Sequence, residues 1–268
     1  MVIKPWRRKC AALPERVRRR TRETMSARTV RLGSSAIGLA IAGITVLALV
    51  LPGAGALPPK EDAWAVIFAT DGGNNGQVAE GLALHDWLLD HGWMDSHIVF
   101  LADHSLADGQ ATKANIQAAL AAVAGVSDGS SSVFISALDY GQWVDGQYYF
   151  DAADDKISGP ELAAWIAPIN AGEMAIEVST RYSGALVPCL AGPGRTVATS
   201  HGAMEDQSTN NYRLSVGLGS SCADQNDDGY VSFQEAHNYE AQFIQTHFPG
   251  TQTPLLLNAG GDLNLNVC

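Results

Sequence analysis

Short apolar runs alternate with segments of helical periodicity in the part of the chain that follows residue 60. The run from Trp64 to Thr70 is uninterrupted and lies between polar residues and the turn-rich sequence DGGNNG, which predicts a strand buried on both faces. A helix is expected from Val78 to His91, with Gly92 where a C-cap glycine belongs. Its residues at helical spacing are Val78, Leu82, His85, Leu88 and Leu89. The same alternation predicts further strands at His97 to Leu101, Ser131 to Leu138, Met174 to Val178 and Thr196 to Thr199.

Two later helices carry capping signals. Thr112 is the expected N-cap of the alanine-rich helix from Lys113 to Ala124. Ser158 and Glu161 form an S-x-x-E capping box with proline at an early helical position, which opens a helix through Ala167. Short apolar strands that alternate with amphipathic helices predict an α/β fold, in which helices flank both faces of a mostly parallel sheet.

The N-terminal region differs in composition from the rest of the chain. Residues 1–56 carry eleven Lys and Arg against two Glu. From Ser34 to Ala56 an apolar run follows two arginines and closes with small residues, which is the three-part pattern of a secretory signal peptide. We therefore expect a secreted or periplasmic protein, cleaved after Ala56, with a single mature domain at residues 57–268 and no transmembrane span in it.

Two alternatives stay open for this region. The uninterrupted apolar stretch from Ala36 to Leu51 is shorter than the roughly 20 residues that a membrane helix needs. An uncleaved N-terminal anchor is nevertheless the competing interpretation, because the basic stretch before the apolar run is long. Translation from Met25 would remove that stretch and leave an ordinary signal peptide.

The charge of the mature chain limits its partners. Residues 57–268 contain six basic residues against twenty-six acidic ones, which gives a formal charge of −20. Such a surplus repels phosphate backbones and attracts cations, so we expect no nucleic-acid binding and look for a divalent metal. The same segment contains Cys189, Cys222 and Cys268, for which one disulfide and one free thiol is the simplest arrangement after export. A bridge between Cys222 and Cys268 would pin two loose segments, but spacing does not determine the pairing.

A calcium-binding loop is predicted from Asp224 to Glu235. The sequence DQNDDGYVSFQE matches the twelve-residue EF-hand pattern at its diagnostic positions, and Gly229 permits the sharp turn at position six. Calcium takes six to eight hard oxygen ligands, and this spacing supplies them in order. The expected ligands are the side chains of Asp224, Asn226 and Asp228, the carbonyl of Tyr230, Ser232 directly or through water, and bidentate Glu235.

The surroundings of this loop indicate an isolated site. A helix should run from Glu235 to about His247, whereas the preceding segment RLSVGLGSS is a poor helix. We therefore expect an EF-hand-like loop with one flanking helix, a weak Kd of about 10⁻⁴ to 10⁻³ M and a mainly structural role for Ca²⁺. The alternative is an acidic, solvated turn without metal.

The order of these elements resembles bacterial members of the legumain-like and caspase-like cysteine peptidase superfamily, over roughly residues 62–258. The pieces that carry the resemblance are WAVIFAT, the helix before SHIVFLAD, ATKANIQAAL, VFISALDYG, ISGPELAAWI, MAIEVSTRYSG and RTVATSHG. Similar bacterial proteins are also expected to carry a DxNxDGxVSxxEA segment near the end. The resemblance implies a caspase-like sheet.

Both catalytic positions of that family differ here. The third strand of the family ends in His-Gly and the fourth in a segment similar to D-S-C-Y-S-G. This chain has Tyr140 at the His position and Arg181 at the Cys position. Arginine stays protonated and cannot attack a carbonyl, and a tyrosine with a pKa of about 10 is a poor general base. We therefore expect no catalytic residues there, and instead a binding edge at which the two side chains hold a peptide or protein ligand, or an Arg181 that only pairs with an acid such as Asp139.

Displaced residues offer an alternative function, a cysteine-type peptidase with a relocated site. Cys189 lies in an apolar context that favours a core or disulfide-bonded cysteine over a nucleophile. His201 follows a strand near the ligand-facing edge, where a structural role is commoner than a catalytic one. Ser183 is an alternative nucleophile, but the spacing of residues in the sequence does not establish a Ser-His-Asp triad around it.

Overall fold

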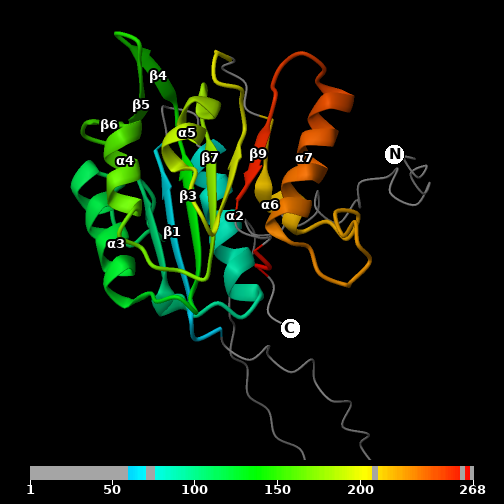
Figure 1. Cartoon of the computed structure of the whole chain (residues 1–268), viewed down its shortest axis with the longest axis horizontal. Helices are drawn as coiled ribbons and strands as arrows, with labels where there is room; N and C mark the ends of the chain where they lie inside the picture. Colours follow the sequence, from blue (N-terminus) through cyan, green and yellow to red (C-terminus); the bar gives the residue numbers. More distant parts are fainter. Residues whose placement is uncertain (1–59, 71–75, 207–210, 260–262, 266–268) are drawn as a thin grey trace, which may run out of the picture. The chain divides into compact units, whose positions relative to one another are not determined.

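Six strands form the central sheet, in the order β2-β1-β3-β7-β8-β9. The computed structural model describes residues 60–70, 76–206, 211–259 and 263–265, so the expectations for residues 1–56 and for Cys268 lie outside the described residues. The first five strands are parallel and β9 is antiparallel at the edge (Figure 1). Their bounds are β1 Ala63–Ala69, β2 Ile98–Ala102, β3 Ser132–Leu138, β7 Glu173–Ser179, β8 Arg195–Thr199 and β9 Leu255–Asn258. The mostly parallel sheet expected from the apolar runs is confirmed, and each predicted strand is shifted by one residue at most.

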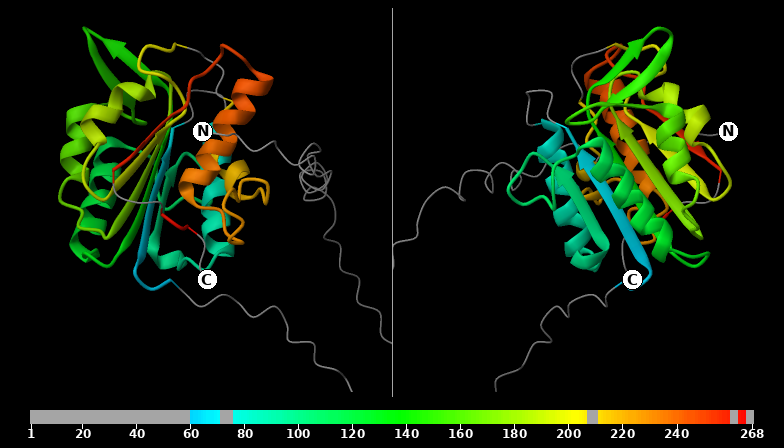
Figure 2. Two further views of the ribbon diagram at one scale, coloured as in Figure 1. Left: turned by 45° about the vertical axis from the view of Figure 1, so that its right-hand side comes forward. Right: turned by 90° about the vertical axis from the view of Figure 1, so that its left-hand side faces the viewer.

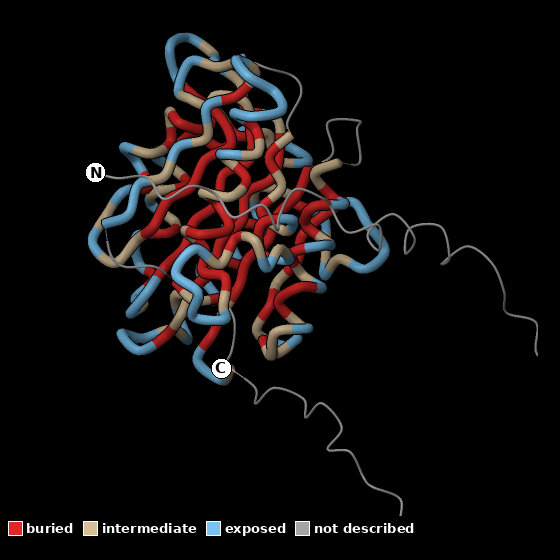
Figure 3. The backbone as a smooth tube through the Cα atoms, turned by 90° about the vertical axis from the view of Figure 1, so that its right-hand side faces the viewer, coloured by how far each residue is buried: buried red, intermediate tan, exposed pale blue. Residues whose placement is uncertain are grey.

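Helices cover both faces of this sheet, as predicted. Alternate residues of β1 separate into two clusters: Ala65 and Ile67 pack with α2, α6 and α7, whereas Val66 and Phe68 pack with α3 and α4. Figures 1 and 2 show these two groups of helices on opposite sides of the strands. The helices are α2 Gly76–Asp90, α3 Lys113–Val126, α4 Gly159–Ile166, α5 Val187–Leu190, α6 Leu214–Leu218 and α7 Phe233–His247, with short 3₁₀ turns at Asp95–His97 and Ser183–Leu186. The strands lie in the buried centre (Figure 3) because both of their faces are covered.

The predicted helix caps are present. Thr112 accepts a hydrogen bond from the Asn115 amide at 3.2 Å. Ser158 and Glu161 complete a reciprocal capping box, in which the Glu161 carboxylate accepts from the Ser158 amide at 2.9 Å. These local hydrogen bonds explain why α3 and α4 begin where the sequence indicated.

The buried face of α2 differs from the expected one. Leu82 and His85 are only partly buried, whereas Leu84 is fully buried and the carboxylate of Glu80 lies inside at 4% exposure. Helical spacing alone does not determine how the helix is rotated about its axis, and hydrogen bonds available inside the domain compensate a buried acid. The expected inner face therefore missed Leu84 and Glu80, whereas Leu82, although only partly buried, does pack against the core as expected.

A second, three-stranded antiparallel sheet was not predicted. It consists of β4 Gly141–Val144, β5 Gln147–Asp151 and β6 Lys156–Ser158. The turn between β4 and β5 is Asp145-Gly146, with φ of 52° and 78°. This dipeptide is the local signal of a two-residue hairpin, which favours positive φ at both central positions. The small sheet follows β3 directly and projects from the carboxyl-terminal end of the central sheet (Figure 2).

The segment before the predicted calcium loop does form a helix, contrary to expectation. α6 has five residues and packs against α7. A Cβ placed on Gly217 would lie 2.5 Å from the carbonyl oxygen of Ala236, so only glycine allows the two backbones to approach so closely. Tertiary contact with α7 therefore stabilises a helix that its composition disfavours.

Gly217→Ala should separate α6 from α7 and destabilise the domain by about 1–3 kcal/mol, because the added methyl group overlaps backbone atoms. Gly125→Ala in α3 is the matched control, since a Cβ at Gly125 meets nothing within 4 Å and alanine favours the helix. Thermal unfolding measures both variants, and each kcal/mol of lost stability should lower the melting temperature by about 2–4 °C. If Gly217→Ala melted at the same temperature as the wild type, this result would contradict the close packing of α6 on α7.

Candidate functional site

A hollow of about 750 Å³ opens at the carboxyl-terminal ends of the central strands. Parallel α/β sheets bind ligands at this edge because their loops and strand ends meet there. The hollow is lined by side chains of β1, β4 and β5, by the turns after β1, β2, β3, β5 and β7, and by the segment before α3. Its described lining residues are Ala69, Thr70, Asp103, Ala111, Asp139, Tyr140, Gln142, Asp151, Ala152, Ala153 and Arg181.

Tyr140 and Arg181 meet at this hollow. The guanidinium carbon of Arg181 lies 5.2 Å from the centre of the Tyr140 ring, in a cation–π arrangement. Arg181 Nη1 also lies 3.3 Å from Asp206 Oδ1, in a partly exposed ion pair. The expectation that both residues share the edge is therefore confirmed, and the acid that pairs with Arg181 is Asp206 rather than Asp139.

The backbone around Arg181 is tightly fitted. A Cβ on Gly141 would lie 2.2 Å from the carbonyl oxygen of Arg181, so β4 begins directly against this residue. Tyr182 has a φ of 57°. Its ring and the ring of the exposed Trp143 make an edge-to-face contact, with 6.4 Å between the ring centroids. Trp143 and Tyr182 each directly follow a lining residue of the hollow, Gln142 and Arg181, but are not themselves among its described lining residues.

Asp139 forms the floor of the hollow. Its carboxyl group is 2% exposed, accepts the Thr70 hydroxyl and lies 2.7 Å from the Asp151 amide that donates to it. Burial raises the pKa of Asp139 well above its ordinary value, although these hydrogen bonds oppose the shift. Asp103 is exposed and Asp151 half-buried, so the rim of the hollow carries negative charge that the Arg181–Asp206 pair does not cancel.

The three displaced candidates lie outside the described lining of this hollow. Cys189 is a free, exposed thiol on α5, so the expectation of a core or disulfide-bonded cysteine was wrong. It lies on the solvent side of this four-residue helix, while the neighbouring Leu190 fills the core. His201 and Ser183 are both at 0% exposure, and the His201 amide donates to Ser183 Oγ at 3.0 Å. These two residues have a structural hydrogen bond and no access to a substrate.

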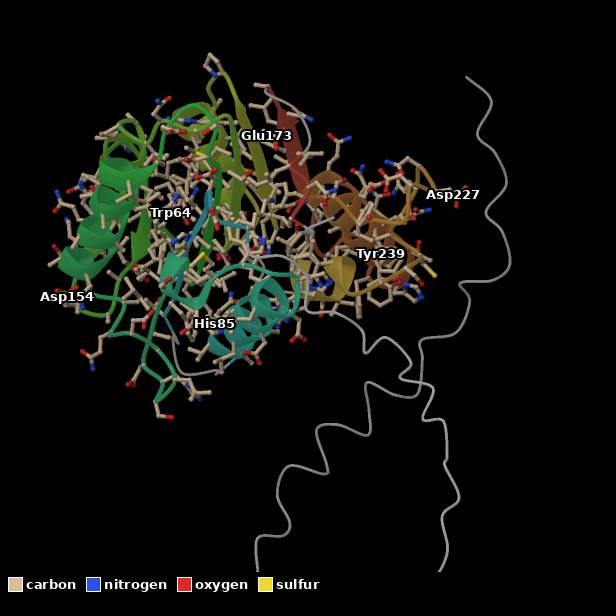
Figure 4. All side chains as sticks on the ribbon, turned by 90° about the horizontal axis from the view of Figure 1, so that it is seen from below. Trp64, His85, Asp154, Glu173, Asp227 and Tyr239 are labelled. Carbon is tan, nitrogen blue, oxygen red and sulfur yellow. The ribbon has the colours of Figure 1, made fainter. Side chains whose placement is uncertain are left out.

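The predicted calcium loop folds as a series of turns around its acidic side chains. Asp224 accepts from the amides of Asp228 at 3.2 Å and Gly229 at 3.0 Å, and Asn226 accepts from Asp228 at 2.8 Å. Gly229 has a φ of 94°, which favours glycine and confirms the sharp turn expected there. The loop projects from the domain, with Asp227 at its outer edge (Figure 4).

Glu235 joins the two ends of the loop. Its Oε1 accepts from the amides of Gln225 at 2.9 Å and Asn226 at 3.1 Å, and its Oε2 accepts from the amide and hydroxyl of Ser232 at 3.0 Å. Ser232 is the N-cap of α7 and completes a capping box with Glu235. Val231 is 7% exposed and packs into the core between the ligand positions. The loop is therefore held at its end by a carboxylate that has many donors.

The loop could bind a metal ion only through several kinds of oxygen ligand. Among the described residues, no group of three or more His, Cys, Asp or Glu side chains is placed to hold a metal ion. The expected calcium ligands also include an amide, a hydroxyl and the Tyr230 carbonyl, which suit calcium as hard oxygens. Asp224 and Glu235 now accept backbone amides, so they would have to give up some of these hydrogen bonds to bind an ion.

Cys222, just before the loop, is disulfide-bonded. Of the two described cysteines, Cys189 is free and Cys222 is bonded to a cysteine outside the described residues, which agrees with one disulfide and one free thiol. The bridge restrains the chain at Cys222, two residues before the loop begins at Asp224. Its stabilising effect arises mainly from restriction of the unfolded chain.

Sequence reasoning missed most of the hollow. Thr70, Asp103, Gln142 and Asp151 all line it, yet none lies in a recognisable motif. Thr70 ends one predicted strand and Asp103 lies two residues after another, and this position is the one signal that could have placed them at this edge.

Comparison with known proteins informs the fold. No known family profile matches the chain, and no curated protein matches it by sequence. Among solved structures, protein GSU0716 from Geobacter sulfurreducens is similar, with a TM-score of 0.52 and 13% identity, over 75% of this chain and 94% of the other. At this identity the similarity shows the fold alone. No described helix is long and apolar enough to cross a membrane.

Glu235→Ala should destabilise the domain by about 1–3 kcal/mol even in the presence of a chelator, because several backbone and side-chain donors lose their acceptor. Denaturant unfolding measures this loss. Asp227→Asn is the control, because residue 227 has a φ of 61° that asparagine also adopts. An equal free energy of unfolding for the wild type and Glu235→Ala would show that Glu235 does not hold the loop.

Proposed function

We propose that this protein is a non-catalytic, caspase-like binding domain, exported from the cell and stabilised by calcium. The observation that carries the proposal is the hollow at the carboxyl-terminal strand ends, where Tyr140 and Arg181 contact each other at 5.2 Å. A cysteine peptidase of this family would need a thiol and an imidazole at these two positions. None of the described lining residues supplies either group.

The charge of the hollow indicates the class of ligand. Asp103 and Asp151 add carboxylates to a hollow whose one guanidinium is already paired with Asp206. A cationic side chain entering the hollow would gain Coulomb attraction, and a carboxylate would meet repulsion. We therefore propose a peptide with a lysine or arginine side chain as the ligand. The exposed Trp143 and the partly buried Tyr182, which each directly follow a lining residue, would offer it a further contact surface beside the hollow.

The loop from Asp224 to Glu235 supports the calcium part of the proposal. Its sequence supplies hard oxygen ligands at EF-hand spacing, and its backbone makes the turn at Gly229. When bound, calcium would neutralise the clustered carboxylates and fix the start of α7. Because the loop lies outside the described lining of the hollow, calcium would act on stability rather than on ligand contacts.

Calcium at about 10 mM should raise the stability of the wild type by about 1.4–2.7 kcal/mol, given the weak Kd expected for an isolated extracellular loop. Glu235→Gln should abolish this gain, because a neutral amide cannot act as a bidentate ligand. Differential scanning calorimetry with calcium and with chelator measures both proteins.

Asp227→Asn is the matched control for this experiment, since position four of the loop is not an expected ligand. It should keep the full gain from calcium. If the wild type melts at the same temperature with calcium and with chelator, the acidic turn without metal is the correct interpretation.

Peptides with a central Lys or Arg should bind more tightly than otherwise identical peptides with Asp or Glu. Asp103→Asn should weaken the binding of the basic peptides by about two- to five-fold, the range expected for an exposed charge pair. Salt should reduce the preference, because the rim is open to solvent. Isothermal titration calorimetry of the purified protein measures the affinities.

Asp145→Asn is the matched control, because Asp145 lies exposed at the hairpin tip, outside the described lining, and asparagine tolerates its φ of 52°. It should leave affinity unchanged. The same peptides are analysed by mass spectrometry for turnover. Cleavage that survives Arg181→Ala but disappears in Cys189→Ala or His201→Ala would overturn the non-catalytic assignment and favour a peptidase with a relocated site.

A further inference from the structure

Three glutamates from three separate elements gather in the interior, away from the hollow. Glu80 of α2, Glu177 of β7 and Glu240 of α7 are 4%, 0% and 2% exposed. The charge of Glu80 acts on both of the other two carboxyl groups. We call these three residues the glutamate cluster. It lies on the face of the sheet that α2, α6 and α7 cover.

Hydrogen bonds satisfy only part of the cluster. Ser136 Oγ donates to Glu177 Oε2 at 2.7 Å, and Arg213 N donates to Glu240 Oε2 at 3.2 Å. Glu80 accepts from the amide and the hydroxyl of Ser215, both at 2.8 Å. Glu177 Oε1 and Glu240 Oε1 are buried without a hydrogen-bond partner among the described residues. Two oxygens are therefore left without compensation, a costly state for an ionised carboxylate.

Few positive charges face the cluster. Arg213, which precedes α6, has its Nε 4.0 Å from Glu80 Oε2 and is the one described cation that acts on it. His237 of α7 lies against Tyr212, whose hydroxyl is 2.9 Å from His237 Nδ1. Burial lowers the pKa of His237 to about 4, so this imidazole is neutral across the neutral range. The remaining groups that face the cluster are the hydroxyls of Ser136, Ser215 and Tyr212.

One guanidinium cannot neutralise three buried carboxylates. Burial, and then the charge of Glu80, raise the pKa of Glu177 to about 8. Burial also raises the pKa of Glu240 to about 8 and raises that of Glu80 above its ordinary value. Protons therefore take the place of missing counter-ions at neutral pH.

We propose that the glutamate cluster is a proton-operated latch, which holds α6 and α7 on the sheet while its carboxyl groups are protonated and loosens both helices when they ionise. The elements that bear the cluster make the effect local. Glu240 belongs to α7 and Glu80 to α2, whereas Glu177 belongs to the central strand β7. Glu80 also accepts hydrogen bonds from Ser215 of α6. Ionised Glu80 would repel both Glu240 and Glu177, so repulsion would act between α2 and α7 and between α2 and the sheet on which these helices pack.

Loosening of α7 would also reach the loop. α7 begins at Phe233, directly after the N-cap Ser232, and Gly217 of α6 packs against Ala236 in its first turn. The latch itself needs no calcium, so it stands independently of the proposed function and can be tested in chelator.

The direction of the pH effect follows from proton linkage. The unfolded carboxyl groups titrate near 4.5, and the folded ones titrate at higher pH. Between these values the folded protein holds more protons than the unfolded one, so its stability falls as pH rises. The contribution of the cluster is complete below a pH of about 4.5 and is lost as pH rises through about 8.

The latch is tested first by thermal unfolding of the protein in chelator between pH values of about 5 and 9. The melting temperature of the wild type should fall across this range. Glu177→Gln and Glu240→Gln, whose amides stay neutral, should each reduce this decline by about half and melt above the wild type at the alkaline end. Glu173 lies exposed on the same strand (Figure 4), so the melting temperature of Glu173→Gln should fall with pH as that of the wild type does.

Hydrogen exchange of the wild type, corrected for intrinsic exchange rates, tests whether the loosening is confined to α6 and α7. This experiment needs no variant. On passing from about pH 6 to about pH 9, amides of α6 and α7 should lose protection by a larger factor than amides of β1 and β3. Infrared spectroscopy of the wild type should show protonated carboxylic acid at neutral pH. The latch would be overturned by an equal loss of protection throughout the domain or by the absence of a protonated acid signal. It would also be overturned if both glutamine variants fold but their melting temperatures fall with pH as much as that of the wild type.

Discussion

Burial of the central strands on both faces is the constraint on which the rest of this structure depends. β1, β3 and β7 have nearly every side chain buried, so each strand needs a layer of helices on both sides. Two apolar clusters satisfy this need, one under α2, α6 and α7 and the other under α3 and α4. Parallel strands also require crossovers, which place all of their carboxyl ends at one edge. The hollow exists because the side chains that follow the strands converge at this edge.

The carboxylates of the hollow and those of the glutamate cluster differ in their access to solvent. At the hollow, Asp103 and Asp151 reach water, so they can remain charged and attract a cation at little cost. In the glutamate cluster, Glu177 and Glu240 have no such access, and a proton is the cheapest compensation for them. Carboxylates therefore underlie the proposed ligand recognition in one place and the proposed sensitivity to pH in the other.

The position of α7 connects the loop with the interior. Its first turn contains Glu235, which closes the loop, and its middle contains Glu240, which belongs to the buried cluster. α6 packs on the same helix through Gly217. A change at either end of α7 can thus be transmitted along one rigid element, since a helix moves as a unit more easily than it bends.

The sequence alone determined the five parallel strands, the caps and the turn at Gly229, but not β9 or the small antiparallel sheet. Apolar periodicity, Ser158 with Glu161, and a glycine at positive φ act over a few residues. It also placed Tyr140 and Arg181 at one edge, since both directly follow apolar strands. Only the tertiary structure decided the inward rotation of Glu80, the formation of α6, the exposure of Cys189 and the gathering of Asp103 and Asp151 around the hollow. Each of these depends on contacts between residues far apart in the chain, whose energies no local pattern records.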